Sequence, residues 1–177
     1  TLSDGNNGLN YNISYANSSV SSITPKALTL SGITADNKIY DGTTTATINT
    51  SGVTNATLVT AGMISGDTLT VSATGAFADK NAGTSKVVTL NSTYGGADAG
   101  NYNITSQAQA YAAITPRVLA VTAIANNKTY DTTRTATYTL NSDQVAGDVL
   151  TLTAGTALFD TKNVANSKTV TVGSITV

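Results

Sequence analysis

Apolar and small polar residues alternate along many short stretches of this 177-residue chain. Residues 27–33, Ala-Leu-Thr-Leu-Ser-Gly-Ile, show the pattern, and residues 118–124, Val-Leu-Ala-Val-Thr-Ala-Ile, repeat it. A period of two places alternate side chains on the buried and the solvated face of a strand. Thr and Val, which favour strands, are common, whereas Glu is absent and other strong helix formers are scarce. The pattern predicts an all-β fold.

Three motifs occur twice along the chain, in the same order. Each copy begins with Lys-x-Tyr-Asp-x-Thr, continues with a Gly-Asp pair before an alternating stretch, and then has Phe-x-x-Lys-Asn. The motifs occupy residues 38–43, 66–71 and 77–81 in the first copy, and residues 128–133, 147–152 and 159–163 in the second. Two copies in the same order indicate tandem repeats of one domain.

A further match near the N-terminus sets the boundaries of the repeats. Asn-Tyr-Asn-Ile at residues 10–13 returns at residues 101–104. We therefore assign residues 1–25 to the tail of a preceding repeat, residues 26–115 to a complete repeat, and residues 116–177 to a second repeat without its last strands. We expect the tail of one copy to complete the second repeat of another copy by strand addition.

The spacing of the strands favours one of two all-β architectures. Short alternating stretches separated by turn residues predict Greek-key-like β-sandwich repeats, arranged end to end. A β-solenoid is the alternative, but its coils repeat about every 20–30 residues and no such period occurs here. The Ile-Thr-Pro junction at residues 114–116 leaves no flexible spacer, because proline restricts the backbone. Residues 51–65, rich in Gly, Asn and Thr, are shortened in the second copy, which predicts a surface loop.

The core of the first repeat is expected to be thin. A domain of about 90 residues buries a limited core, and large apolar residues are few. The candidates are Leu28, Leu30, Ile33, Tyr40, Ile48, Leu69, Val71, Phe77, Val88, Leu90, Tyr102 and Ile104.

Two side chains that are common in catalytic sites are absent from this chain. It has no His to act as the base of a nucleophilic triad and no Cys to act as a nucleophile. Its two Ser-Lys pairs, residues 85–86 and 167–168, occupy adjacent positions, which a strand points to opposite faces. We predict no catalytic residue, no cofactor, no zinc or copper site and no enzyme activity.

Charge and hydropathy bear on two further classes of partner. A net charge of −1 provides no basic surface, so no binding of nucleic acid is expected. No apolar run approaches the roughly 20 residues needed to span a bilayer, so no membrane insertion is expected. No signal peptide is recognisable, and an exported protein would therefore contain this chain as an internal part.

The Lys-x-Tyr-Asp motif is interpreted as a structural turn. Lys38 and Tyr40 lie two positions apart, so we expect the Lys stem to lie along the Tyr ring. Asp41 is expected to accept hydrogen bonds from the backbone amides of the following Thr residues. A Thr with positive φ is costly, so Thr132 in place of Gly42 predicts that the Asp cap is the common element. The structural motif residues are Lys38, Tyr40, Asp41, Lys128, Tyr130 and Asp131.

Three hypotheses about ligands or modification stand beside that structural interpretation. A Lys–Asn amide cross-link would use Lys38 or Lys80 with Asn101, near a protonated Asp. Calcium is a candidate ligand at the oxygen-rich residues 4–8 and 96–101, although the EF-hand spacing is absent. A glycan would bind on rows of Thr hydroxyls or on exposed aromatic rings. The candidate rings are Tyr11, Tyr15, Tyr94, Tyr102 and Tyr111.

Motifs from most of the chain carry a family resemblance. Residues 40–42 (Tyr-Asp-Gly), 77–83 (Phe-Ala-Asp-Lys-Asn-Ala-Gly) and 99–102 (Ala-Gly-Asn-Tyr) resemble the YDG-type repeat of filamentous-haemagglutinin-like large exoproteins and adhesins of Gram-negative bacteria. The Ile-Thr-Pro junction is similar to the one that joins such repeats. The second copy departs from the pattern at Thr132 and at residues 163–166, Asn-Val-Ala-Asn.

The resemblance implies a biological setting. It implies two-partner secretion through an outer-membrane protein, display at the bacterial cell surface, and a part in adhesion, aggregation or biofilm formation. Its repeats would be non-catalytic stalk modules whose partners are the neighbouring repeats of the same exoprotein. The alternative is a carbohydrate- or exopolysaccharide-binding module of the same adhesin, with a glycan or a host or bacterial surface receptor as its partner.

Overall fold

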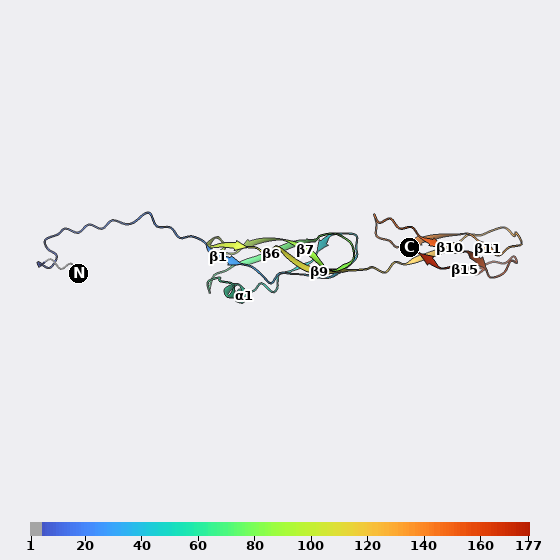
Figure 1. Ribbon diagram of the computed structural model, residues 1–177, viewed down its shortest axis with the longest axis horizontal. Helices are drawn as coiled ribbons and strands as arrows, with labels where there is room; N and C mark the ends of the chain where they lie inside the picture. Colours follow the sequence, from blue (N-terminus) through green and yellow to red (C-terminus); the bar gives the residue numbers. More distant parts are fainter. Residues whose placement is uncertain (1–4) are drawn as a thin grey trace.

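The computed structural model describes residues 5–177, and they form the predicted all-β fold. The first repeat contains β1 (Lys26–Thr29), β2 (Thr34–Ala35), β3 (Lys38–Ile39), β4 (Thr45–Ala46), β5 (Ile48–Asn49), α1 (Asn55–Thr60), β6 (Thr70–Phe77), β7 (Gly83–Gly95), η1 (Ala99–Asn101), β8 (Tyr102–Thr105) and β9 (Gln109–Thr115). The second contains β10 (Val121–Ala125), β11 (Thr135–Ala136), β12 (Tyr138–Ser142), β13 (Thr153–Ala154), β14 (Ala157–Phe159), β15 (Val170–Val172) and β16 (Ile175–Thr176). The two groups follow one another along the long axis of the molecule (Figure 1).

A five-stranded sheet in the order β3-β9-β7-β6-β4 is the largest sheet of the first repeat. Strands β6 and β7 pair antiparallel from Thr70 opposite Gly95 to Phe77 opposite Val88. Burial alternates along β6 and is deepest at Phe77, so the two-residue period of the sequence is realised here. Two smaller sheets, β2–β5 and β1–β8, accompany the large one.

The interior of the first repeat consists of two apolar clusters. The first contains Ile33, Ala46, Phe77, Val88, Leu90, Ala110, Ala112 and Ile114. The second contains Leu28, Leu30, Leu58, Met63, Leu69 and Tyr102. Of the twelve candidate core residues, Tyr40, Ile48, Val71 and Ile104 are half-buried and pack against these clusters, while the others are buried. Each fully buried Leu, Ile or Phe contributes about 1.5–3 kcal/mol to stability.

Residues 51–65 were predicted to be a surface loop; most of them are exposed, but the segment is not only a loop. They contain helix α1, which begins with a capping box between Thr54 and Thr57. The amide of Thr57 donates to Thr54 Oγ1 at 3.3 Å, and the amide of Thr54 donates to Thr57 Oγ1 at 2.8 Å. Leu58 and Met63 are each only 3% exposed. The segment therefore closes the second apolar cluster, and the Thr-x-x-Thr spacing was the signal for its start.

The second repeat is more open than the first. Ala136 and Ala157 are its only buried apolar residues in the part of the chain that the structure describes. Strand β15 lies at the edge of the order β11-β14-β15, whereas β7, its counterpart, lies between β6 and β9. The described residues of the second repeat include no strand equivalent to β9. Residues 5–24 are largely exposed and extend from the end of the first repeat that faces away from the second (Figure 1). Strand addition by this segment stays a prediction.

Candidate functional site

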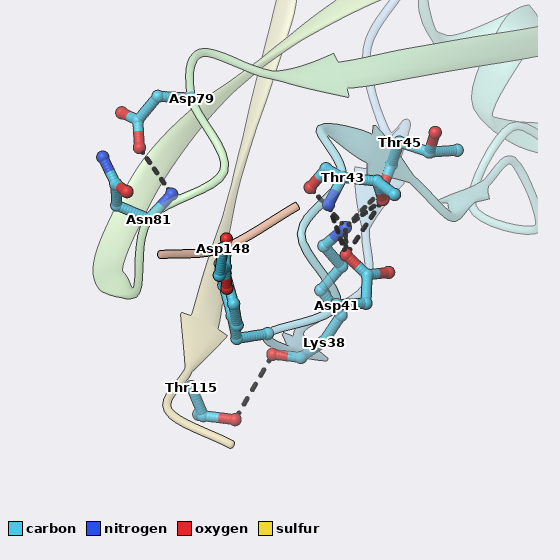
Figure 2. Close-up of polar contacts among 9 residues, drawn as sticks. Lys38, Asp41, Thr43, Thr45, Asp79, Asn81, Thr115 and Asp148 are labelled. Atoms are coloured by element: carbon cyan, nitrogen blue, oxygen red, sulfur yellow. Dashed lines mark hydrogen bonds and ion pairs between the residues drawn. The ribbon is translucent and has the colours of Figure 1, made fainter. Parts of the chain in front are cut away.

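A lysine ammonium organises each Lys-x-Tyr-Asp turn. Lys38 Nζ donates to Asp41 Oδ1 at 2.8 Å, to the carbonyl of Thr43 at 2.8 Å and to the carbonyl of Thr45 at 3.0 Å (Figure 2). The ammonium lies 5.5 Å from the centroid of the Phe77 ring. The ring contact of the Lys38 ammonium is thus with Phe77, and packing of the Lys38 stem on Tyr40 stays a prediction. The Phe77 amide donates to the Thr44 carbonyl at 2.7 Å, and this contact brings Phe77 to the turn.

The aspartate of the motif caps the same turn in both copies. Asp41 Oδ1 accepts the backbone amide of Thr43 at 2.9 Å, and Asp131 Oδ1 accepts that of Thr133 at 2.9 Å. Hydrogen bonds from the lysine and from this Thr lower the pKa of each carboxyl to about 2. Thr132 has φ +67°, close to +79° at Gly42, so the second copy keeps the left-handed conformation despite its cost for a Thr residue.

A second pair of charges holds the Phe-x-x-Lys-Asn turn. Lys86 Nζ lies 2.7 Å from Asp79 Oδ1, and Lys168 Nζ lies 2.7 Å from Asp160 Oδ1. The acid is one position earlier in the motif of the second copy, yet the same lysine reaches it. The turn presents Lys80 in the first repeat and Lys162 in the second.

Asp148 of the second repeat binds two side chains of the first. Its carboxylate oxygens accept the Tyr40 hydroxyl at 2.8 and 2.7 Å, and Oδ1 lies 2.7 Å from Lys80 Nζ. Figure 2 shows Asp148 between the Lys38 turn and the turn that contains Asp79. The Asp148 side chain is only 18% exposed. The Lys80 and Tyr40 bonds lower the pKa of Asp148, while the Asp148 bond raises the pKa of Lys80. We call Tyr40, Lys80 and Asp148 the junction lock.

Hydrogen bonds and an ion pair hold the connecting segment on both sides of Pro116. On the side of the first repeat, the Tyr40 amide donates to the Thr115 carbonyl at 2.8 Å. On the side of the second, Arg117 Nη2 lies 3.1 Å from Asp143 Oδ2, and Asp143 Oδ1 accepts the Ala120 amide at 2.8 Å. Since both flanks are bound and proline restricts the residue between them, few backbone torsions remain free at the junction.

An apolar pocket lies beside the junction lock. Its lining includes Tyr40 of the first repeat and Leu119, Val145, Leu150 and Val177 of the second. The lining also includes the polar side chains of Arg117, Asp143, Gln144 and Asp148. Its composition fits side-chain packing between two repeats.

The cross-link candidates have other partners in the structure. Lys38 bonds within its own turn, Lys80 bonds to Asp148, and Asn101 ends η1, where its amide donates to the Asp98 carbonyl at 3.0 Å. No lysine–Asn101 hydrogen bond occurs among residues 5–177. The cross-link stays a prediction, and an intact mass lower by one ammonia per bond would reveal it.

The calcium candidates are only partly described. Asp4 lies outside the described residues. In the loop of residues 96–101, Asp98 Oδ2 accepts the Thr68 amide at 2.8 Å, so that carboxylate closes a turn. Within residues 5–177, no three His, Cys, Asp or Glu side chains are grouped as a metal site would require. None of the helices in this range has the length and apolar character to cross a bilayer.

The contact through Asp148 was not foreseen from the sequence. The Gly-Asp pair was interpreted only as a turn, and Tyr40 only as a core residue. One feature of the sequence could have indicated this contact. The Tyr, Lys and Gly-Asp positions recur together in both copies, and a single hairpin turn does not need all of them.

Comparison with known protein families finds a match to one family, and this match covers most of the chain. The YDG domain matches residues 24–110 and again residues 115–177. No match to this chain was found among curated proteins or solved structures.

Proposed function

Because this chain belongs to the YDG domain family, we propose that it is a non-catalytic stalk segment of a secreted bacterial surface adhesin. Its repeats would carry the adhesive parts of a large exoprotein of the filamentous-haemagglutinin-like class away from the Gram-negative cell surface. Their partners are neighbouring repeats of the same protein, and their contribution is to adhesion, aggregation or biofilm formation.

The contact through Asp148 is the observation that supports a structural role. Tandem domains without a shared interface move freely about their linker. Here Asp148 of one repeat is held by Tyr40 and Lys80 of the other, and Arg117 binds Asp143 just beyond the connection. Such contacts limit bending between repeats, and limited bending is what a stalk requires.

An exchange of the repeats tests this proposal. Replacement of residues 26–177 in the surface protein by unrelated β-sandwich repeats of equal length should preserve adhesion to the target surface. Deletion of the same residues should reduce it, because the reach is lost. Loss of adhesion in the equal-length exchange would contradict a stalk role.

The alternative function is binding of carbohydrate or exopolysaccharide. Of the candidate tyrosines, Tyr102 is buried and Tyr94 is half-buried, with its hydroxyl bonded to Ser106. The exposed rings are Tyr11 and Tyr15 in the N-terminal segment and Tyr111 on β9. Binding of the chain to a glycan array, abolished by substitution of these three exposed tyrosines, would favour the alternative.

A further inference from the structure

We propose that the chain binds a second copy of itself head to tail, through Tyr130 and Lys162 of one copy and Asp67 of the other. The contact would repeat the junction lock in trans. The inference rests on the geometry of that lock and does not depend on a role in adhesion.

The Gly-Asp turn of the first repeat has the same conformation as the turn engaged in the lock. The Asp67 amide donates to the Ile64 carbonyl at 3.2 Å, and the Asp148 amide donates to the Val145 carbonyl at 3.1 Å. The preceding glycines have φ +100° at position 66 and +90° at position 147. Asp67 accepts the Tyr102 hydroxyl of its own repeat, but no lysine pairs with it among residues 5–177. It therefore offers the carboxylate of a lock without the cation.

The second repeat presents the complementary half. Lys128 Nζ lies 2.8 Å from Asp131 Oδ1 and 5.6 Å from the Phe159 ring centroid, as Lys38 does in its own turn. The Tyr130 side chain is 53% exposed, whereas Tyr40, which binds Asp148, is half-buried. Lys162 is exposed and has no ion-pair partner in the described chain. The second repeat therefore offers the Tyr130 hydroxyl and the Lys162 ammonium, which are two of the three groups of a lock, but no carboxylate to bind them.

The two halves lie at opposite ends of the molecule. Helix α1, whose C-terminal end leads to the Gly66-Asp67 turn, lies at the end of the first repeat away from the second (Figure 1). Strand β11, which follows Tyr130, lies toward the far end of the second repeat (Figure 1). Contacts between different surfaces at opposite ends are heterologous, and they extend a series instead of closing a symmetric dimer.

Thr132 is the position at which the free half departs from the occupied one. A Cβ atom on Gly42, its counterpart, would lie 2.7 Å from Val145 Cγ1. Thr132 therefore crowds the incoming counterpart of Val145, which is Ile64. Replacement of Thr132 by Gly should strengthen the association, while loss of Lys162 or Asp67 should weaken it.

Disulfide trapping suits this chain because it contains no Cys. The Gly42 Cβ position lies 3.9 Å from Val145 Cβ, within the roughly 3.5–4.5 Å that a disulfide spans. The equivalent pair across two copies is Thr132 and Ile64. We would mix single variants of the 177-residue chain, Thr132→Cys and Ile64→Cys, under mild oxidation and follow disulfide-linked species by non-reducing electrophoresis.

The expected result is a heterodimer that forms several-fold faster than either homodimer. Lys162→Ala in the Thr132→Cys chain, or Asp67→Asn in the Ile64→Cys chain, should remove that excess, with the homodimer rates correcting for thiol reactivity. A mixture in which heterodimer and homodimers form at the same corrected rate would overturn the proposal. So would an excess that neither substitution changes.

An intramolecular pair provides the matched control. Gly42→Cys with Val145→Cys in one chain should form an internal disulfide, and Asp148→Asn should slow its formation. Thr132 at φ +67° shows that this turn accepts a side chain at the position of Gly42. Failure of the internal disulfide would refute the geometry of the junction lock, and the head-to-tail inference with it.

Discussion

Lys80 and Asp148 belong to different repeats, and their side chains form an ion pair of 2.7 Å across the junction. The Tyr40 hydroxyl shares the same carboxylate. A single ion pair that is partly open to solvent adds little stability. Its consequence here is geometric. Tyr40 and Lys80 of the first repeat and Asp148 of the second keep their contact only while the two repeats keep their relative orientation.

Substitution of Asp148 should loosen the junction without unfolding either repeat. Asp148→Asn removes the charge that Lys80 binds, so the angle between the repeats should vary more widely. Residual dipolar couplings of the two repeats would then no longer fit one common alignment tensor. Asp67→Asn is the matched control, because Asp67 sits in the same kind of turn away from this junction. Unchanged couplings in Asp148→Asn would show that the lock does not restrain the repeats.

The two motif aspartates should make the chain sensitive to acid. The pKa of Asp41 falls from 3.8 to about 2 on folding, and that of Asp131 does the same. A lowered folded-state pKa stabilises the folded protein above the unfolded pKa, and this stabilisation disappears as the pH falls through the folded pKa. The urea midpoint should therefore be constant above about pH 5 and fall between about pH 4 and 2.

The double variant Asp41→Asn/Asp131→Asn is the comparison for that titration. It should be less stable at neutral pH, because the lysines lose their charged partners, and its midpoint should depend less on pH. A variant that falls between pH 4 and 2 as steeply as the unmodified chain would assign the acid sensitivity to other carboxylates.

Helix α1 should matter for the stability of the first repeat. Leu58→Ala opens a cavity in the second apolar cluster and should lower the free energy of unfolding by about 2–5 kcal/mol. The neighbouring Val59 is 41% exposed, so Val59→Ala is the control and should have a much smaller effect. Urea denaturation followed by circular dichroism measures both. Equal effects of the two substitutions would contradict the helical placement of Leu58.

Substitutions at the left-handed positions Gly42 and Thr132 should change the stability of their repeats in opposite directions. Thr132→Gly relieves positive-φ strain and should stabilise the second repeat by about 1 kcal/mol. Gly42→Ala adds that strain and a Cβ atom 2.7 Å from Val145 Cγ1, so it should destabilise the first repeat and disturb the junction. Thermal unfolding of both variants tests the pair. A destabilising Thr132→Gly would mean that the Thr side chain makes compensating contacts.

Patterns within short stretches of the sequence predicted much of this structure. The alternation along β6 and the twofold occurrence of the motifs predicted an all-β chain with two similar parts, since strand periodicity and turn chemistry are encoded within a few residues. The bond from Thr43 to Asp41 was foreseen for the same reason, because it joins residues two positions apart.

Tertiary packing decided the rest. The ring beside the Lys38 ammonium is that of Phe77, Leu58 and Met63 are buried in a cluster with residues from distant strands, and Asp148 binds Tyr40 across 108 positions of the chain. Such contacts depend on how whole sheets and whole repeats pack. Each of them joins residues that are far apart in the sequence, so a short stretch of sequence contains only one of the two partners.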